Sequence, residues 1–168
     1  MKKIFVFFCC FASMVLMISC GGEEDCRSIN GNMWSSLAPT ELVWAEADDY
    51  CNNLNECGHS DWYLPTISEL RTLFKNCPEV ETGGSCKITD ECLSTYCDNE
   101  DCFMDREALY IYSRLGDKDI VLWSSSKVSN LSHDEFWVAI FSLGRIYRYY
   151  ARGYSGIPLT ARCVRNAD

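Results

Sequence analysis

The sequence predicts a small α+β domain that is cross-linked by disulfides. Apolar residues recur at helical spacing in the first half of the chain, and short apolar strands separated by turn residues fill the last third. Helices followed by consecutive strands are typical of an α+β fold with an antiparallel sheet. Twelve cysteines in 168 residues indicate the cross-links, and an aromatic content of 13% supplies enough large side chains for a core.

The chain begins with a segment that resembles a bacterial lipoprotein signal. Two lysines precede an apolar run over residues 4–18, which is too short to span a bilayer comfortably. The run ends in Leu-Met-Ile-Ser before Cys20 and so resembles a lipobox, with Met17 where leucine is usual. We therefore expect residues 1–19 to be a signal peptide and Cys20 to be lipidated. Ordinary signal cleavage near the same place is the alternative.

The next segment, residues 20–30, is expected to be a lipid-anchored linker. Each acyl methylene buried in a membrane contributes about 0.8 kcal/mol, so the lipid on Cys20 would hold the protein at a membrane. Gly21 does not resemble an inner-membrane retention signal, and the acidic residues 23–25 resemble the export tags of some surface lipoproteins. We predict a lipid anchor in the outer membrane of the cell envelope, with surface exposure as one outcome.

The rest of the chain has the length of one domain, which we place at residues 31–166. The formal net charge is −9, and removal of the two lysines of the signal makes it −11. Such a charge argues against a generic nucleic-acid binder, so no nucleic-acid partner is expected.

Nine cysteines remain when the signal and Cys20 are set aside: Cys26, Cys51, Cys57, Cys77, Cys86, Cys92, Cys97, Cys102 and Cys163. In an exported domain they predict a disulfide framework. Because nine is odd, one thiol must be free, reactive or paired with another molecule.

Five of these cysteines lie in residues 77–105, the Cys-rich insertion, which holds eight acidic residues and one lysine. Cross-links must order this segment, since it has few apolar side chains to bury. A zinc or iron–sulfur site is disfavoured, because no CxxC pair occurs and both histidines lie elsewhere. Calcium would lack the regular ligand spacing of an EF-hand. We expect a solvated acidic face and neither a metal nor a cofactor.

The first predicted elements are a strand over residues 31–36 and a helix over residues 43–55. Trp44, Ala47, Cys51 and Leu54 recur at helical spacing and form one apolar stripe. A second helix begins at Ile67, where Thr66 and Glu69 have the spacing of a capping box, and is expected to end at about Asn76.

The elements after the insertion are mostly strands. A short helical or extended piece over residues 107–115 leads out of the insertion. Predicted strands follow over residues 120–123, 136–141, 145–150 and 160–165. Between the second and third of these strands, Gly144 can take the positive φ of a tight hairpin.

The order of motifs resembles the Lcl C-terminal domain family, named for a bacterial collagen-like surface adhesin. The motifs are Gly31-Asn32-Met33-Trp34, Trp44-Ala45-Glu46-Ala47, Asp61-Trp62-Tyr63-Leu64-Pro65-Thr66, Leu122-Trp123-Ser124-Ser125, Trp137-Val138 and Arg162-Cys163-Val164-Arg165. The resemblance covers residues 31–166 apart from the insertion. It implies a C-type-lectin-like fold of two helices and a small twisted antiparallel sheet whose first and last strands meet. It also implies a disulfide between Cys51 and Cys163.

The departures from related proteins limit the functions that this resemblance implies. The Glu-Pro-Asn, Gln-Pro-Asp and Trp-Asn-Asp motifs of calcium-dependent lectins do not occur, and neither does the catalytic cysteine motif of formylglycine-generating oxidases. No Ser-His-Asp elbow, HExxH or phosphate loop is present. With two histidines, an acid–base enzyme would depend on carboxylates such as Glu46, Asp48, Asp49, Asp61 and Glu69.

The candidate ligand-binding residues alternate Arg and Tyr on the predicted strand and just after it. They are Arg145, Tyr147, Arg148, Tyr149, Tyr150, Arg152 and Tyr154. Arg pairs with sulfate or carboxylate, and Tyr rings stack on sugar faces, so an acidic polysaccharide would satisfy both. The competing interpretation is structural: Tyr favours strands, and Arg protects a sheet edge from aggregation.

We therefore predict a non-catalytic envelope lipoprotein that binds a glycan or another extracellular ligand in an adhesion role. The alternatives are an enzyme of the formylglycine-generating fold group and a purely structural envelope protein.

Overall fold

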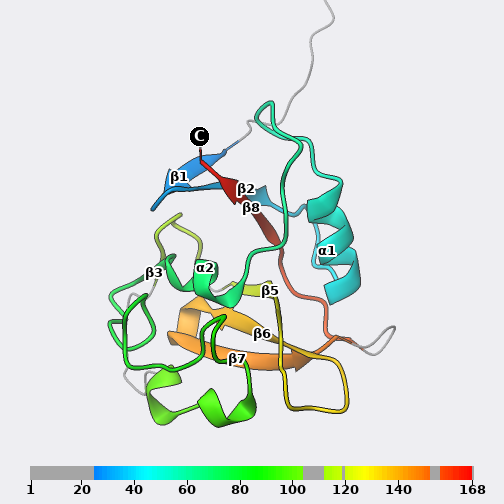
Figure 1. Cartoon of the computed structure of the whole chain (residues 1–168). Coiled ribbons are helices and arrows are strands. Elements are labelled where there is room, and N and C mark those ends of the chain that lie inside the picture. Colours follow the sequence, from blue (N-terminus) through cyan, green and yellow to red (C-terminus); the bar gives the residue numbers. More distant parts are fainter. Residues whose placement is uncertain (1–24, 104–111, 119, 152–155, 168) are drawn as a thin grey trace, which may run out of the picture.

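The computed structural model describes residues 25–103, 112–118, 120–151 and 156–167 (Figure 1). The predicted signal peptide, Cys20, Arg152 and Tyr154 lie outside these residues. The described part is α+β, as predicted, with two α-helices, two three-stranded antiparallel sheets and a two-stranded ribbon. The sequence predicts one sheet, and the structure corrects this to two. None of the helices among these described residues combines the length and the apolar character of a membrane span.

The first sheet has the strand order β1-β2-β8. Its strands are β1 (Arg27–Ile29), β2 (Asn32–Leu37) and β8 (Arg162–Asn166). The strand near the start of the domain therefore pairs with the last one, as the resemblance implies. Asn30 and Gly31 have φ values of 53° and 83°, as a two-residue hairpin of this twist requires. β1 lies within residues 20–30, which are predicted to form a linker.

The first helix, α1 (Trp44–Asn52), turns its buried residues Ala47 and Cys51 toward the sheets. A disulfide joins Cys51 to Cys163 in β8, with the Cα atoms 5.4 Å apart. This is the pair that the resemblance implies.

The second helix, α2 (Ile67–Arg71), starts at the predicted capping box but is much shorter than predicted. The Thr72 hydroxyl donates to the Glu69 carbonyl over 2.6 Å. This hydrogen bond takes the place of the backbone N–H that would bind the same carbonyl if the helix continued. Beyond α2, β3 (Phe74–Lys75) pairs with β4 (Tyr112–Ser113). The buried Phe74 ring packs on the Phe141 ring, with centroids 4.5 Å apart. Tertiary packing therefore ends the helix at this point.

The second sheet has the order β5-β6-β7, which makes β7 an edge strand (Figure 1). Its strands are β5 (Val121–Lys127), β6 (Glu135–Ile140) and β7 (Arg145–Tyr150). A 3-10 turn, η3 (Phe141–Leu143), and Gly144 with φ 53° connect the last two strands, which confirms the predicted hairpin. α2 packs against β5 and β6, α1 contacts both β5 and β8, and Leu122 of β5 forms a bridge to Thr160 before β8.

The Cys-rich insertion contributes to the core instead of lying wholly in solvent. Disulfides join Cys86 to Cys102 and Cys92 to Cys97, around the short 3-10 turns η1 (Thr95–Cys97) and η2 (Glu100–Cys102). Val80 and Ile88 are fully buried in the same cluster as α2 and β6 residues.

A buried arginine anchors the start of the insertion. The Arg71 guanidinium donates to the carbonyls of Val80, Ile88 and Glu81 over 2.7 to 2.9 Å. Burial lowers the pKa of Arg71, and the carbonyl oxygens compensate for part of the lost hydration.

Candidate functional site

The predicted contact residues lie on the edge strand β7, and the structure describes Arg145, Tyr147, Arg148, Tyr149 and Tyr150. Successive side chains of β7 point to opposite faces of the sheet. Tyr147 and Tyr149 lie on the side of Trp123, and the Trp123 and Tyr149 rings meet edge to face with centroids 6.5 Å apart. Ile146, on the other side, is buried in the core cluster that includes α2. Neither face of β7 is therefore simply solvated.

Arg145 lies between two aromatic rings. Its guanidinium carbon is 4.2 Å from the centroid of Tyr147 and 4.9 Å from that of Phe103. Phe103 belongs to the Cys-rich insertion and forms a backbone bridge with Arg145. The two rings stabilise the cation through cation–π contacts and restrict its position.

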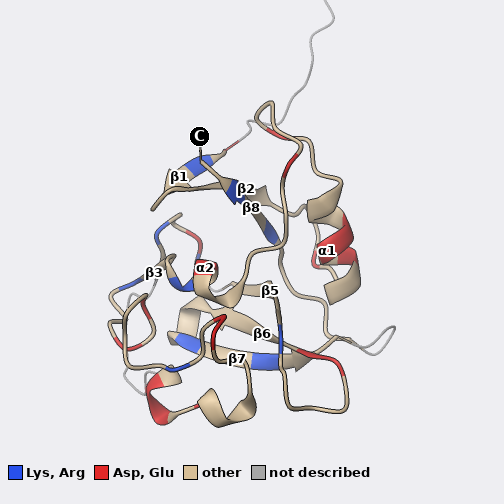
Figure 2. Ribbon diagram, in the orientation of Figure 1, with Lys and Arg blue, Asp and Glu red and all other residues tan. Residues whose placement is uncertain are grey.

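Arg148 faces two carboxylates. Its Nε lies 2.9 Å from Glu135 Oε2, and its Nη1 donates to Asp98 Oδ2 over 3.3 Å. The first contact is an ion pair without good hydrogen-bond alignment, because Glu135 Oε2 has no partner that meets hydrogen-bond geometry. Figure 2 shows the basic segments of β7 beside acidic segments of the insertion.

Glu135 is the most buried charged group near β7, with 6% of its surface exposed. Its Oε1 lies 2.9 Å from Nε2 of His133. The His133 ring in turn stacks on the Tyr150 ring, with centroids 5.0 Å apart. The chain of contacts from Arg148 through Glu135 and His133 fixes one side of Tyr150, which is 55% exposed.

These residues line an open pocket of about 360 Å³ at the sheet edge. Its walls are Glu135, Tyr147, Arg148, Tyr149, Tyr150 and Ile157. The tyrosine rings offer flat apolar faces with a hydroxyl at one end, and the guanidinium offers several N–H donors. Such a mixture can hold a ring that is apolar on its faces and hydroxylated at its edge, as sugars are.

Several residues around this pocket were missed by sequence reasoning: Asp98, Phe103, His133, Glu135 and Ile157. Glu135 begins an otherwise apolar strand, and a charged residue in such a position is a sequence signal for a candidate site residue. Asp98 and Phe103 gave none, because their approach to β7 depends on how the insertion folds back.

Four of the five carboxylates considered for acid–base chemistry, Glu46, Asp48, Asp61 and Glu69, have structural partners. Glu69 accepts from the Tyr63 hydroxyl and the Thr66 amide over 2.7 and 2.8 Å. Asp61 accepts from Arg165 Nε over 2.8 Å, and this contact lowers the pKa of Asp61. Glu46 accepts from the backbone N–H of residue 43 at the start of α1, and Asp48 accepts from a side-chain amide in the same helix.

The odd cysteine is Cys77, which is free and fully buried. Its Sγ donates to the Gly144 carbonyl over 3.6 Å, and burial raises the pKa of the thiol to about 11. A protonated, enclosed thiol is a poor nucleophile, so Cys77 does not support the enzyme alternative. A fourth disulfide joins Cys26 to Cys57 next to Glu56, which leaves these sulfurs unsuited as metal ligands.

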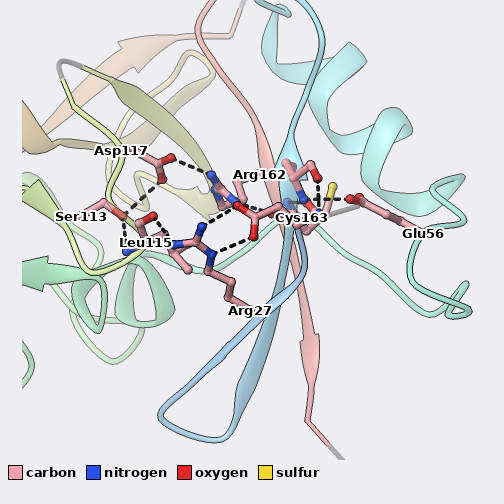
Figure 3. A network of polar contacts seen from close by, with 10 residues as sticks. Arg27, Glu56, Ser113, Leu115, Asp117, Arg162 and Cys163 are labelled. Carbon is pink, nitrogen blue, oxygen red and sulfur yellow. Dashed lines mark hydrogen bonds and ion pairs between the residues drawn. The ribbon is translucent and has the colours of Figure 1, made fainter. Parts of the chain in front are cut away.

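A second polar network lies between the first sheet and the segment around Asp117 (Figure 3). Arg162 Nη2 donates to Asp117 Oδ1 over 2.7 Å, and both side chains are at most 10% exposed. Arg162 also donates to the Ser35 carbonyl in β2, and Arg27 in β1 donates to the Leu115 carbonyl over 3.0 Å. The network ties the first sheet to the segment around Asp117, which is a structural role.

Fold and site together define a disulfide-stapled α+β module with an aromatic pocket on an edge strand. A model of the Lcl C-terminal domain family matches residues 25–165. The chain belongs to the Lcl C-terminal domain family. The match begins before residue 31, where the domain was predicted to start, and it includes β1. Neither a curated protein nor a solved structure matches the chain significantly, and the C-type-lectin-like arrangement stays a prediction.

Proposed function

We propose that this protein is a non-catalytic, adhesion-type module of the cell envelope that binds a glycan in the pocket beside β7. One observation carries the proposal: the exposed Tyr150 ring, two partly buried tyrosine rings and an arginine line a single pocket of about 360 Å³. A pocket of this size suits one or two sugar rings, and its open form suits a chain that continues beyond it.

The pocket groups have complementary roles in this proposal. The Tyr150 ring is held by His133 and stays 55% exposed, so it can stack on a sugar face. Tyr147 and Tyr149 meet edge to face with centroids 5.6 Å apart and form a second aromatic wall. Arg148 is anchored by two carboxylates and retains N–H groups that can donate to hydroxyl oxygens.

Display at the envelope is the second part of the proposal. The lipobox-like sequence before Cys20 supports a lipid anchor, and the acidic residues 23–25 support an outer-membrane location. Metabolic labelling with a fatty acid would test this part. Label should enter the wild-type protein and not Cys20→Ser, and equal labelling of both would refute the anchor.

Glycan-array screening of residues 21–168, followed by calorimetry on the best ligand, tests the binding function. Tyr150→Ala should weaken binding roughly fivefold, because a lost ring stack is worth about 1 kcal/mol. Tyr96→Ala is the matched control, since Tyr96 is 89% exposed and lies outside the pocket. A Tyr150 variant that binds like the Tyr96 variant would refute this site, and no bound glycan on the array would refute the function.

A further inference from the structure

We infer that the pocket beside β7 selects an uncharged sugar over an acidic one, and that the Cys-rich insertion sets this preference through Asp98. The inference rests on the proposed glycan-binding function and narrows it. It replaces the acidic polysaccharide that the alternating Arg and Tyr residues of the sequence suggest.

The positive charge of Arg148 is already compensated. Glu135 Oε2 lies 2.9 Å from its Nε, and Asp98 Oδ2 lies 3.3 Å from its Nη1. A sulfate or carboxylate that approached Arg148 would meet these two carboxylates at short range, and like charges repel in such a partly buried place. A sugar hydroxyl meets no such repulsion and can still accept from the remaining N–H groups.

Arg145 does not restore a basic site in the pocket. Its guanidinium is stacked between Phe103 and Tyr147, and it is not among the residues that line the pocket. Within the described lining, the charged groups are Glu135 and Arg148, which cancel, and Asp98 adds a negative charge beside them.

The insertion holds Asp98 in this position by covalent and polar contacts. Asp98 follows η1, which the Cys92–Cys97 disulfide closes, and precedes η2, which the Cys86–Cys102 disulfide anchors. The Thr95 amide also donates to the Asn130 side chain over 2.8 Å. Asp98 therefore faces Arg148 from a rigid loop. The charge of the pocket thus depends on the Cys-rich insertion and not only on the second sheet.

The test compares Asp98→Asn with Glu91→Gln, which removes the same charge from an exposed position of the insertion without a described contact to β7. Each protein is titrated with heparin as the acidic probe and with a neutral β-glucan oligosaccharide that the array identifies. Wild type should prefer the neutral probe. Asp98→Asn should bind heparin at least threefold more tightly than Glu91→Gln, and the added Arg148→Gln change should cancel this gain.

The outcomes separate the inference from the function. Equal heparin affinity of the two single variants, or a wild-type preference for heparin that depends on Tyr150, overturns the inference and leaves glycan binding intact. Absence of binding to both probes and to the array overturns the function and the inference with it.

Discussion

The disulfide between Cys51 and Cys163 should contribute more to stability than any other covalent link of known position in the fold. It closes a loop with a sequence separation of 112, and both cysteines are fully buried. In the chain-entropy model, a loop of this length stabilises the folded state by about 4.8 kcal/mol at 25 °C. Replacement of both residues by Ala should lower the free energy of unfolding by this amount, which is a large part of the stability of a typical domain.

The matched comparison is the disulfide between Cys26 and Cys57. It has a sequence separation of 31, for which the same model gives about 3.7 kcal/mol. Cys26 and Cys57 are also less buried than Cys51 and Cys163, so less packing is lost with them. The Cys51/Cys163 double variant should therefore be less stable than the Cys26/Cys57 double variant by at least about 1 kcal/mol.

Urea denaturation followed by tryptophan fluorescence measures both variants, because Trp34, Trp123 and Trp137 are fully buried. Each free energy is extrapolated with the variant's own m-value, because the loss of a cross-link expands the unfolded chain and raises m. Equal stability of the two double variants, or the reverse order, would contradict the loop-length argument. Peptide mapping that finds Cys51 and Cys163 unpaired would contradict the architecture itself.

Three other predictions concern single groups. At pH 8, iodoacetamide should label Cys77 in urea but not in the native protein. Because folding raises the pKa of this thiol from 9.0 to about 11, the free energy of unfolding should also fall as the pH rises through this range. That part of the fall should be absent in Cys77→Ala. Rapid native labelling would show that the thiol is accessible. Asp117→Asn, which leaves the buried Arg162 without its counter-charge, should lower the free energy of unfolding by about 3 kcal/mol, whereas loss of the exposed ion pair of Lys127 should cost less than about 1 kcal/mol. Gly144→Ala should cost about 1 kcal/mol, because φ 53° with ψ 47° is left-handed, and an unchanged urea midpoint would show that the hairpin relaxes.

Local signals in the sequence predicted those elements whose cause is local. The capping box of Thr66 and Glu69 starts α2 as predicted, and the hairpin at Gly144 joins β6 to β7. The Asn30-Gly31 turn is an equally strong local signal for the hairpin of β1 and β2, although residues 20–30 are predicted to be a linker. In these places, backbone geometry and short-range hydrogen bonds decide the structure.

Long-range contacts decide what local signals could not predict. α2 ends early because Phe74 packs on Phe141 and because β3 pairs with β4, two contacts far apart in the sequence. The candidate site shows the same limit. The alternation of Arg and Tyr located β7, but the ion pair of Arg148 with Asp98 depends on the path of the insertion and has no sequence pattern.

That path is fixed at both ends of the insertion by groups of the core. Near its start, Arg71 of α2 donates to three insertion carbonyls, and Leu93 in its middle accepts from the Trp137 indole of β6 over 3.0 Å. At its other end, Phe103 bridges to β7. Because these anchors use backbone atoms of the insertion, its exposed side chains are free to vary without loss of the attachment. A change at Asp98 can therefore alter the charge of the pocket while the helices and sheets stay as they are, so the insertion is the part of the fold in which we expect ligand preference to change most readily.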